Sequence, residues 1–119
     1  MSQQSSAPAN GFVELPDMEA LDRFLAQSNG SPALVFKHSN SCGISARALS
    51  EMSRIDLPIG LIIVQHARAV SNEIETRTGV VHETPQVFIM RDREVLWTAS
   101  HAQIKTEAVR AALLEITGQ

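Results

Sequence analysis

The stretch ALVFKHSNSCGIS, residues 33–45, decides the fold of this chain. Its first four residues are apolar and run into a polar Lys-His-Ser segment, which is typical of a buried strand whose carboxyl end reaches the surface. Directly after Cys42, apolar side chains recur every four residues at Ile44, Ala48 and Met52, the spacing of one helix face. The pattern predicts a strand that leads into a helix, with Cys42 at the amino-terminal boundary of that helix.

Proline and glycine divide the rest of the chain into short elements on both sides of this unit. Upstream, Asp17 is a candidate N-cap, and apolar side chains at helical spacing predict a helix that stops at Asn29-Gly30. Downstream, the sequence predicts a central strand at 59–64, a helix at 68–78 with Gly79 as its C-cap, strands at 86–90 and 94–99 that form a hairpin, and a final helix marked by Val109, Ala112, Leu113 and Ile116.

The order of these elements predicts the fold class. A strand, a helical crossover and a second strand form a parallel pair, to which the hairpin adds antiparallel strands. We expect an α/β protein of the thioredoxin-like type, with a mixed four-stranded sheet flanked by helices on both faces. Residues 12–119 would form this domain, and residues 1–11, rich in Ser, Gln, Ala and Asn, are expected to be a disordered tail.

The composition argues against several classes of protein. The chain has 119 residues, 44% of them hydrophobic, and its net charge is −3 with scattered Lys and Arg, so we expect no nucleic-acid partner. No apolar stretch approaches the roughly 18 residues that cross a membrane, and the amino terminus lacks the pattern of a secretory signal. The single cysteine can form no intramolecular disulfide, which indicates a reducing, cytoplasmic location.

Cys42 is the candidate catalytic residue. A thiol attacks a disulfide as the thiolate, and the free N–H groups at a helix amino terminus stabilise that negative charge. The backbone N–H groups of Ile44 and Ser45 are the candidate donors, the Ser45 hydroxyl is a further one, and Gly43 leaves another N–H free. The alternative is a buried, inert cysteine, but the small and polar neighbours, Ser41 among them, favour a reactive thiol.

Ser45 stands where a Cys-x-x-Cys motif has its second cysteine, so Cys42 has no partner in this chain to resolve a mixed disulfide. The chemistry then needs two exchanges, in which Cys42 takes a small-thiol adduct from a protein and a second small thiol removes it. No metal or organic cofactor is required. Metal-ligand spacing is absent among the histidines, which are His38, His66, His82 and His101.

Thr84-Pro85 is the second candidate feature, because it directly precedes a predicted strand. In the expected fold this loop lies beside Cys42, where a cis bond would leave the Thr84 main chain free to pair with an extended substrate. The alternative is a proline that only opens a strand.

Four segments together resemble the monothiol bacilliredoxins of the bacillithiol system: FKHSxxCxIS at 36–45, RxxSN at 68–72, HETPQ at 82–86 and WxxSHxxI at 97–104. The resemblance covers nearly the whole chain after the tail. It implies a thioredoxin fold, an active-site thiol at Cys42, a cis bond at Pro85, and removal of bacillithiol from S-thiolated cytosolic proteins during oxidative stress. Members of the family often carry proline after the cysteine, where this chain has Gly43.

This resemblance makes S-thiolated proteins the expected partners and bacillithiol the co-substrate. Because bacillithiol carries carboxylates, Lys37, Arg68 and His101 are candidate substrate-binding residues. His38 and Ser41, which flank the same segment as Cys42, complete the set.

Two other functions stay open at this point. Gly43 brings the motif near the Cys-Gly-Phe-Ser of monothiol glutaredoxins, which hold iron–sulfur clusters with glutathione, although the Gly-Gly-x-Asp-like segment expected after the last strand is missing. A thioredoxin-like module that binds a partner protein without turnover needs only the fold.

Overall fold

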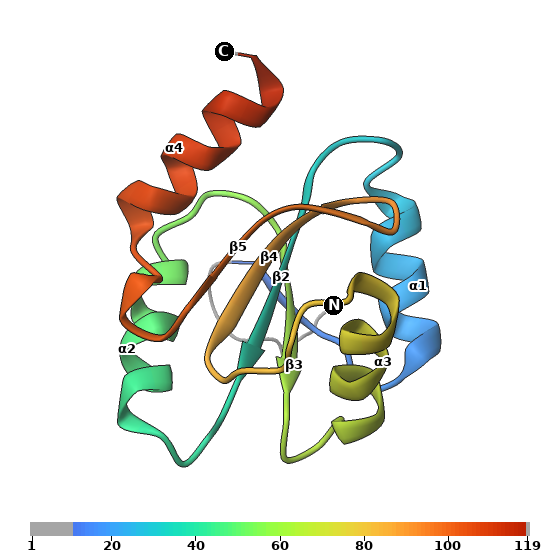
Figure 1. Ribbon diagram of the computed structural model, residues 1–119, viewed down its shortest axis with the longest axis vertical. Helices are drawn as coiled ribbons and strands as arrows, with labels where there is room; N and C mark the ends of the chain where they lie inside the picture. The colour runs from blue at the N-terminus through green and yellow to red at the C-terminus, as the bar shows by residue number, and fades with distance from the viewer. Residues whose placement is uncertain (1–10, 119) are drawn as a thin grey trace, which may run out of the picture.

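The computed structural model describes residues 11–118, which form one sheet between two layers of helices (Figure 1). The strands are β1 (Phe12–Glu14), β2 (Ala33–His38), β3 (Ile59–Ile63), β4 (Gln86–Arg91) and β5 (Glu94–Ser100). The helices are α1 (Met18–Gln27), α2 (Gly43–Met52), α3 (Arg68–Thr78) and α4 (Thr106–Thr117), with a short 3₁₀ helix, η1, at His101–Gln103. Except for Gly11, the predicted amino-terminal tail lies outside the described residues.

The sheet has the strand order β1-β3-β2-β4-β5, with β1, β3 and β2 parallel and β4 and β5 antiparallel to their neighbours. The prediction of a mixed sheet in an α/β fold is confirmed, but the expected four strands are corrected to five. The missed strand, β1, has three residues and only Phe12 is buried, so it shows no alternating pattern of its own. It is a strand because it pairs with β3, where Phe12 lies opposite Ile59.

Alternation along the strands divides the core into two halves. Leu34 and Phe36 of β2 pack on the side covered by α2 and α4, whereas Val35 packs on the side covered by α1 and α3. Successive side chains of a strand point to opposite faces, so Lys37 and His38 at the end of β2 also lie on opposite sides of the sheet. This divergence places the polar groups of the site described below.

Gly60 allows α1 to lie close to the sheet. A Cβ atom at this position would stand 2.7 Å from Leu15 Cδ1 and 3.0 Å from the ring of Phe24, inside van der Waals contact. The parallel strand β3 therefore needs a residue without a side chain where α1 crosses it.

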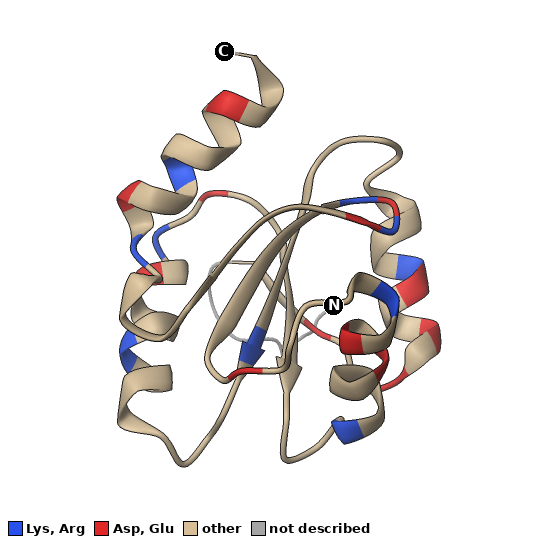
Figure 2. Cartoon of the chain, in the orientation of Figure 1, with Lys and Arg blue, Asp and Glu red and all other residues tan. Residues whose placement is uncertain are grey.

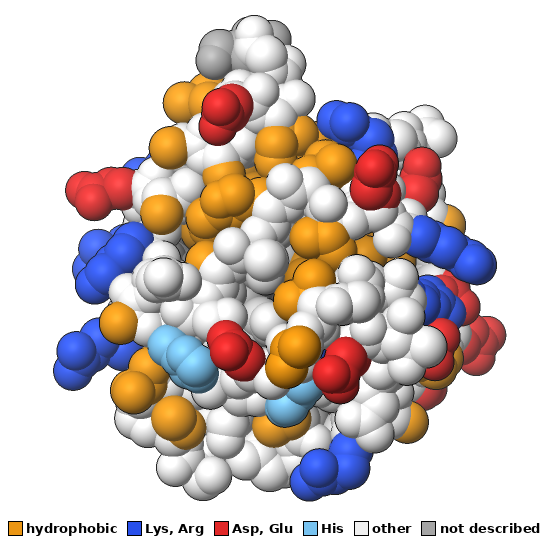
Figure 3. Space-filling view, in the orientation of Figure 1, with side chains coloured by type: hydrophobic (Ala, Val, Ile, Leu, Met, Phe, Trp, Pro, Cys, Tyr) orange, Lys and Arg blue, Asp and Glu red, His pale blue; other side chains and the backbone are white. Residues whose placement is uncertain are grey.

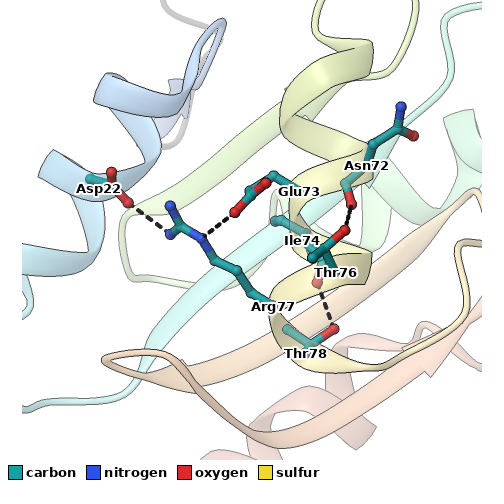
Figure 4. Close-up of polar contacts among 7 residues, drawn as sticks. All are labelled: Asp22, Asn72, Glu73, Ile74, Thr76, Arg77 and Thr78. Carbon is teal, nitrogen blue, oxygen red and sulfur yellow. Dashed lines mark hydrogen bonds and ion pairs between the residues drawn. The ribbon is translucent and has the colours of Figure 1, made fainter.

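Arg77 ties α3 to α1 on the outside of this layer (Figure 4). Its Nη1 donates to Asp22 at 2.7 Å and its Nε donates to Glu73 at 3.0 Å. The hydrogen bond from Arg77 holds the pKa of the Asp22 carboxyl below its usual value. The contact fixes the position of α3, which contributes side chains to the site at its other end.

Charged side chains are spread over both helical layers (Figure 2). Among residues 11–118, no helix is long and apolar enough to cross a membrane.

Candidate active site

Cys42 is the N-cap residue of α2, with extended backbone angles (φ −118°, ψ 124°), and its carbonyl accepts the Ala46 N–H at 3.0 Å. The side chain is partly exposed and makes no capping hydrogen bond. The first turn, which begins with Gly43, Ile44 and Ser45, contains no acidic residue. Free backbone N–H groups at a helix start favour negative charge in general, and Cys42 stands at this position.

Ser45 joins this turn to the end of β2. Its hydroxyl is fully buried, lies 2.8 Å from His38 Nδ1 and accepts the Ser39 N–H at 2.9 Å. Burial lowers the pKa of His38, against the effect of its hydrogen bonding to Ser45, so the ring is neutral near pH 7. The hydroxyl holds the start of α2 against the end of β2, and its expected role as a further donor to the sulfur of Cys42 stays a prediction.

Gln65, which sequence reasoning missed, holds the loop that precedes the thiol. Its carbonyl oxygen accepts the Asn40 N–H at 3.1 Å, and its amide nitrogen donates to Ser39 Oγ at 2.9 Å and to Ser41 Oγ at 3.2 Å. A single glutamine in the turn after a central strand carries no sequence signal. Its role follows only from the parallel pairing of β2 with β3, which places the ends of both strands together.

The Thr84-Pro85 peptide bond is cis, in agreement with the sequence expectation. Antiparallel pairing sets Gln86, the first residue of β4, opposite Lys37, so this loop lies at the same edge of the sheet as the end of β2 and the start of α2 (Figure 1). Gln86 is buried and holds the loop from inside, since its amide donates to the Val81 carbonyl and its oxygen accepts the Glu83 N–H.

His101 is brought to the same loop. Its backbone N–H donates to the Pro85 carbonyl at 3.0 Å, and its exposed ring stands 3.9 Å from the Glu83 carboxylate. Figure 3 shows histidine and acidic side chains next to one another on the lower half of one face. The turn requires a positive φ of 55° at His101, which introduces the 3₁₀ helix that sequence reasoning missed.

Lys37 is fully buried, although the sequence predicts it among the substrate-binding residues. Its Nζ lies 3.0 Å from His82 Nδ1 and above the ring of Phe88. Burial lowers the pKa of Lys37 to about 8, with the negative charge of Glu75 acting in the opposite direction. The ammonium is directed to the interior of the α3 side and not to solvent.

The remaining candidates separate into two groups. Ser41 and Arg68 are exposed, and Arg68 begins α3. His38 is buried against α2, on the opposite side of the sheet from Lys37. The structure therefore places Thr84, Pro85, Ser41 and His101 on the sheet edge that carries Cys42, and it places Lys37 and His38 beneath that edge. In the described part of the chain, no three His, Cys, Asp or Glu side chains gather in a way that could hold a metal ion.

Known structures share this architecture. A solved structure described as a candidate oxidoreductase with a thioredoxin fold is 27% identical, with a TM-score of 0.79 over 86% of this chain and 93% of the other. Thioredoxin from Trypanosoma brucei brucei is 14% identical, with a TM-score of 0.75 over 98% of this chain and all of that chain. Thioredoxin from Fasciola hepatica is 11% identical, with a TM-score of 0.71 over 86% and 96%. The fold is therefore that of thioredoxin.

A family model described as "Monothiol bacilliredoxin BrxC" matches residues 13–109, from β1 into α4. The matched range contains the segment around Cys42, the cis proline loop and the turn at His101. It confirms the resemblance drawn from the four sequence segments, and both family and fold are those of thiol-disulfide oxidoreductases. The chain belongs to the monothiol bacilliredoxin family.

Proposed function

We propose that this protein removes bacillithiol from S-thiolated cytoplasmic proteins through a mixed disulfide on Cys42. The observation that carries the proposal is the position of Cys42, whose partly exposed thiol begins α2 at the sheet edge that also holds the cis proline loop. The residue one helical turn further, Ser45, is a buried hydroxyl bonded to His38. The site thus offers one sulfur.

Two exchanges complete the reaction. In the first, the Cys42 thiolate attacks the bacillithiol sulfur of the protein mixed disulfide, a new S–S bond forms, and the protein thiol leaves as the thiolate and takes up a proton. In the second, the thiolate of another bacillithiol molecule attacks the adduct sulfur, which releases the bacillithiol disulfide and restores Cys42. The net reaction converts the protein mixed disulfide and one free bacillithiol thiol into a protein thiol and the bacillithiol disulfide, so the exchanges require no metal or organic cofactor.

The substrate protein would be held by the loop that ends in Pro85. The Thr84 main chain lies at the edge of the site and can pair with an extended segment around the modified cysteine. Ile44 and Val81 are 52% and 70% exposed, and they belong to the first turn of α2 and to the loop before the cis bond. Apolar contacts from these two side chains would supplement main-chain pairing.

The carboxylates of bacillithiol would meet exposed basic side chains. Arg68 and His101 are exposed, and Ser41 offers a hydroxyl next to the sulfur. Lys37 and His38 are buried, which favours an indirect role in which they position other residues. Alanine at Arg68 or His101 should slow removal of the adduct, and unchanged rates in both variants would refute this part of the proposal.

Intact-mass spectrometry tests the reaction directly. Reduced wild-type protein is mixed with a bacillithiolated protein and, separately, with the same protein carrying glutathione. We expect the bacillithiol adduct to move to the wild type and to be absent from Cys42→Ser, which has no other cysteine that could accept it. Free bacillithiol should then restore the reduced mass.

Other outcomes would redirect the interpretation. Preferential uptake of glutathione, or a brown protein with bound iron and sulfide, would favour the glutaredoxin-like function. No transfer from either substrate, with slow alkylation of Cys42 by iodoacetamide at pH 7, would favour a binding module without turnover.

A further inference from the structure

A polar contact chain leads from the interior to the cis proline loop. It starts at Lys37 in β2, passes through the ring of His82 and ends at Thr84, the residue before the cis bond. The Lys37 Nζ and Ser71 Oγ atoms lie 3.0 Å and 3.1 Å from His82 Nδ1, and the Thr84 Oγ1 atom lies 3.2 Å from His82 Nε2. The two exchange steps described above involve neither Lys37 nor His82 nor Ser71.

The chemistry of these groups determines the direction of each hydrogen bond. A protonated lysine has three donors and no acceptor, so Nδ1 of His82 must accept from Lys37. A neutral imidazole that accepts at Nδ1 carries its proton at Nε2. That N–H can only donate, and the atom within reach is the Thr84 hydroxyl oxygen.

The surroundings keep the His82 ring neutral. Partial burial and the positive charges of Lys37 and Arg68 lower the pKa of His82, while Glu75 and Glu83 act in the opposite direction. The Ser71 hydroxyl, buried in α3, lies 3.1 Å from the same Nδ1 atom and can share its single lone pair with Lys37. One tautomer is therefore favoured near pH 7.

We propose that Lys37 is a positioning residue whose ammonium fixes His82 as the Nε2–H tautomer, so that this N–H orients Thr84 and the substrate-pairing main chain beside Cys42. The effect on turnover rests on the proposed function, whereas the tautomer and the order of the loop do not. The buried lysine acts on the substrate side of the site without touching the substrate.

Nitrogen NMR tests the proposed tautomer of His82 and its effect on Thr84, and it requires no turnover. In reduced full-length protein labelled at its histidines, long-range proton–nitrogen spectra at pH 7 should show a protonated Nε2 and a bare Nδ1 for His82, assigned with the His82→Gln variant. Lys37→Met should weaken that preference and shift the Thr84 amide, whereas Lys105→Met, at the other and exposed lysine, should do neither. A wild-type ring protonated at Nδ1, or an unmoved Thr84 amide in Lys37→Met, would overturn the proposal.

Kinetics of adduct transfer test whether the position of Thr84 affects substrate binding. Losing one exposed hydrogen bond predicts a KM for the bacillithiolated protein that is roughly threefold higher in Thr84→Val, with kcat unchanged, and Lys37→Met should raise this KM in the same direction. Thr84→Ser, which keeps the hydroxyl, should restore the wild-type KM, and Thr76→Val serves as a control at an exposed threonine of α3. Iodoacetamide should alkylate Cys42 at the same rate in all these variants.

The outcomes separate the two proposals. A wild-type KM in both Lys37→Met and Thr84→Val, or a Thr84→Ser variant as impaired as Thr84→Val, would overturn the positioning role. A wild type that takes no adduct from any protein would refute the proposed function, and the ring and amide spectra would then decide the positioning of Thr84 on their own.

Discussion

Replacing the buried lysine should change how stability depends on pH. Lys37 is fully buried at the end of β2, and its ammonium has His82 as its hydrogen-bond acceptor. Lys37→Met keeps the length and much of the volume of the side chain and removes the charge. The measured quantity is the difference in the free energy of unfolding between wild type and Lys37→Met, which cancels the titration of groups that both proteins share.

The magnitude follows from the pKa of Lys37, which burial lowers from 10.5 to about 8 in the folded protein. Below pH 8 both states carry the proton, and the folded state bears the full cost of burying the charge. Above pH 8 the folded protein releases the proton before the unfolded chain does, so wild-type stability rises with pH. The full difference corresponds to about 3.4 kcal/mol, of which about 2.5 kcal/mol is gained between pH 7 and pH 10.

Urea unfolding at several pH values between 7 and 10 provides the assay. Both proteins should carry Cys42→Ser to prevent oxidation. His82 lies beside Lys37, but the pKa of His82 is lowered and it titrates below this window. The wild type should gain about 2.5 kcal/mol relative to Lys37→Met over the range. A gain smaller than about 1 kcal/mol would refute the reasoning, because Lys37 would then titrate above about pH 9 in the folded protein.

Three further substitutions test the fold around the site by urea unfolding. Gly60→Ala should lower the free energy of unfolding by about 1–3 kcal/mol, because its Cβ would stand 2.7 Å from Leu15 Cδ1. An unchanged urea midpoint would contradict this and show that α1 moves away from β3 at no cost. Ser45→Ala should cost about 1–3 kcal/mol by leaving buried partners unpaired, whereas Ser50→Ala, exposed on the same helix, should stay within about 0.5 kcal/mol. Gly43→Ala should stabilise the protein by about 0.5–1 kcal/mol, since the added Cβ meets no atom within 4 Å beyond its chain neighbours and its own helix backbone, and a loss of stability would contradict this.

Local patterns predicted most of the fold. Asp17 accepts the Ala20 N–H as the N-cap of α1, and Gly79 ends α3 with a left-handed conformation, as the sequence indicates. These features depend on a few neighbouring residues, so a sequence contains them. The strand β1 could not be predicted from its neighbouring residues, because it is a strand only through pairing with β3, about 47 positions further along the chain.

The residues of the site show the same difference between local features, which a sequence contains, and tertiary contacts, which it does not. Cys42 at a helix start and Pro85 before a strand are local features, and both were predicted. The burial of Lys37 could not be predicted from the sequence, because a Lys-His pair after an apolar run is typical of a strand that has reached the surface. Only the tertiary structure shows that α3 and the loop before Pro85 cover this position, since His82 lies 45 residues further along the chain.

The end of β2 connects both halves of the site through its alternation. His38 points to the α2 side and holds Ser45, so it fixes the turn that presents the Cys42 sulfur. Lys37 points to the α3 side and reaches the loop of the cis proline through His82. Two consecutive residues of the central strand β2 therefore contact the start of α2, next to Cys42, and the loop of the cis proline. A shift of the β2 register by one residue would exchange the two faces and break both the His38–Ser45 and the Lys37–His82 contacts.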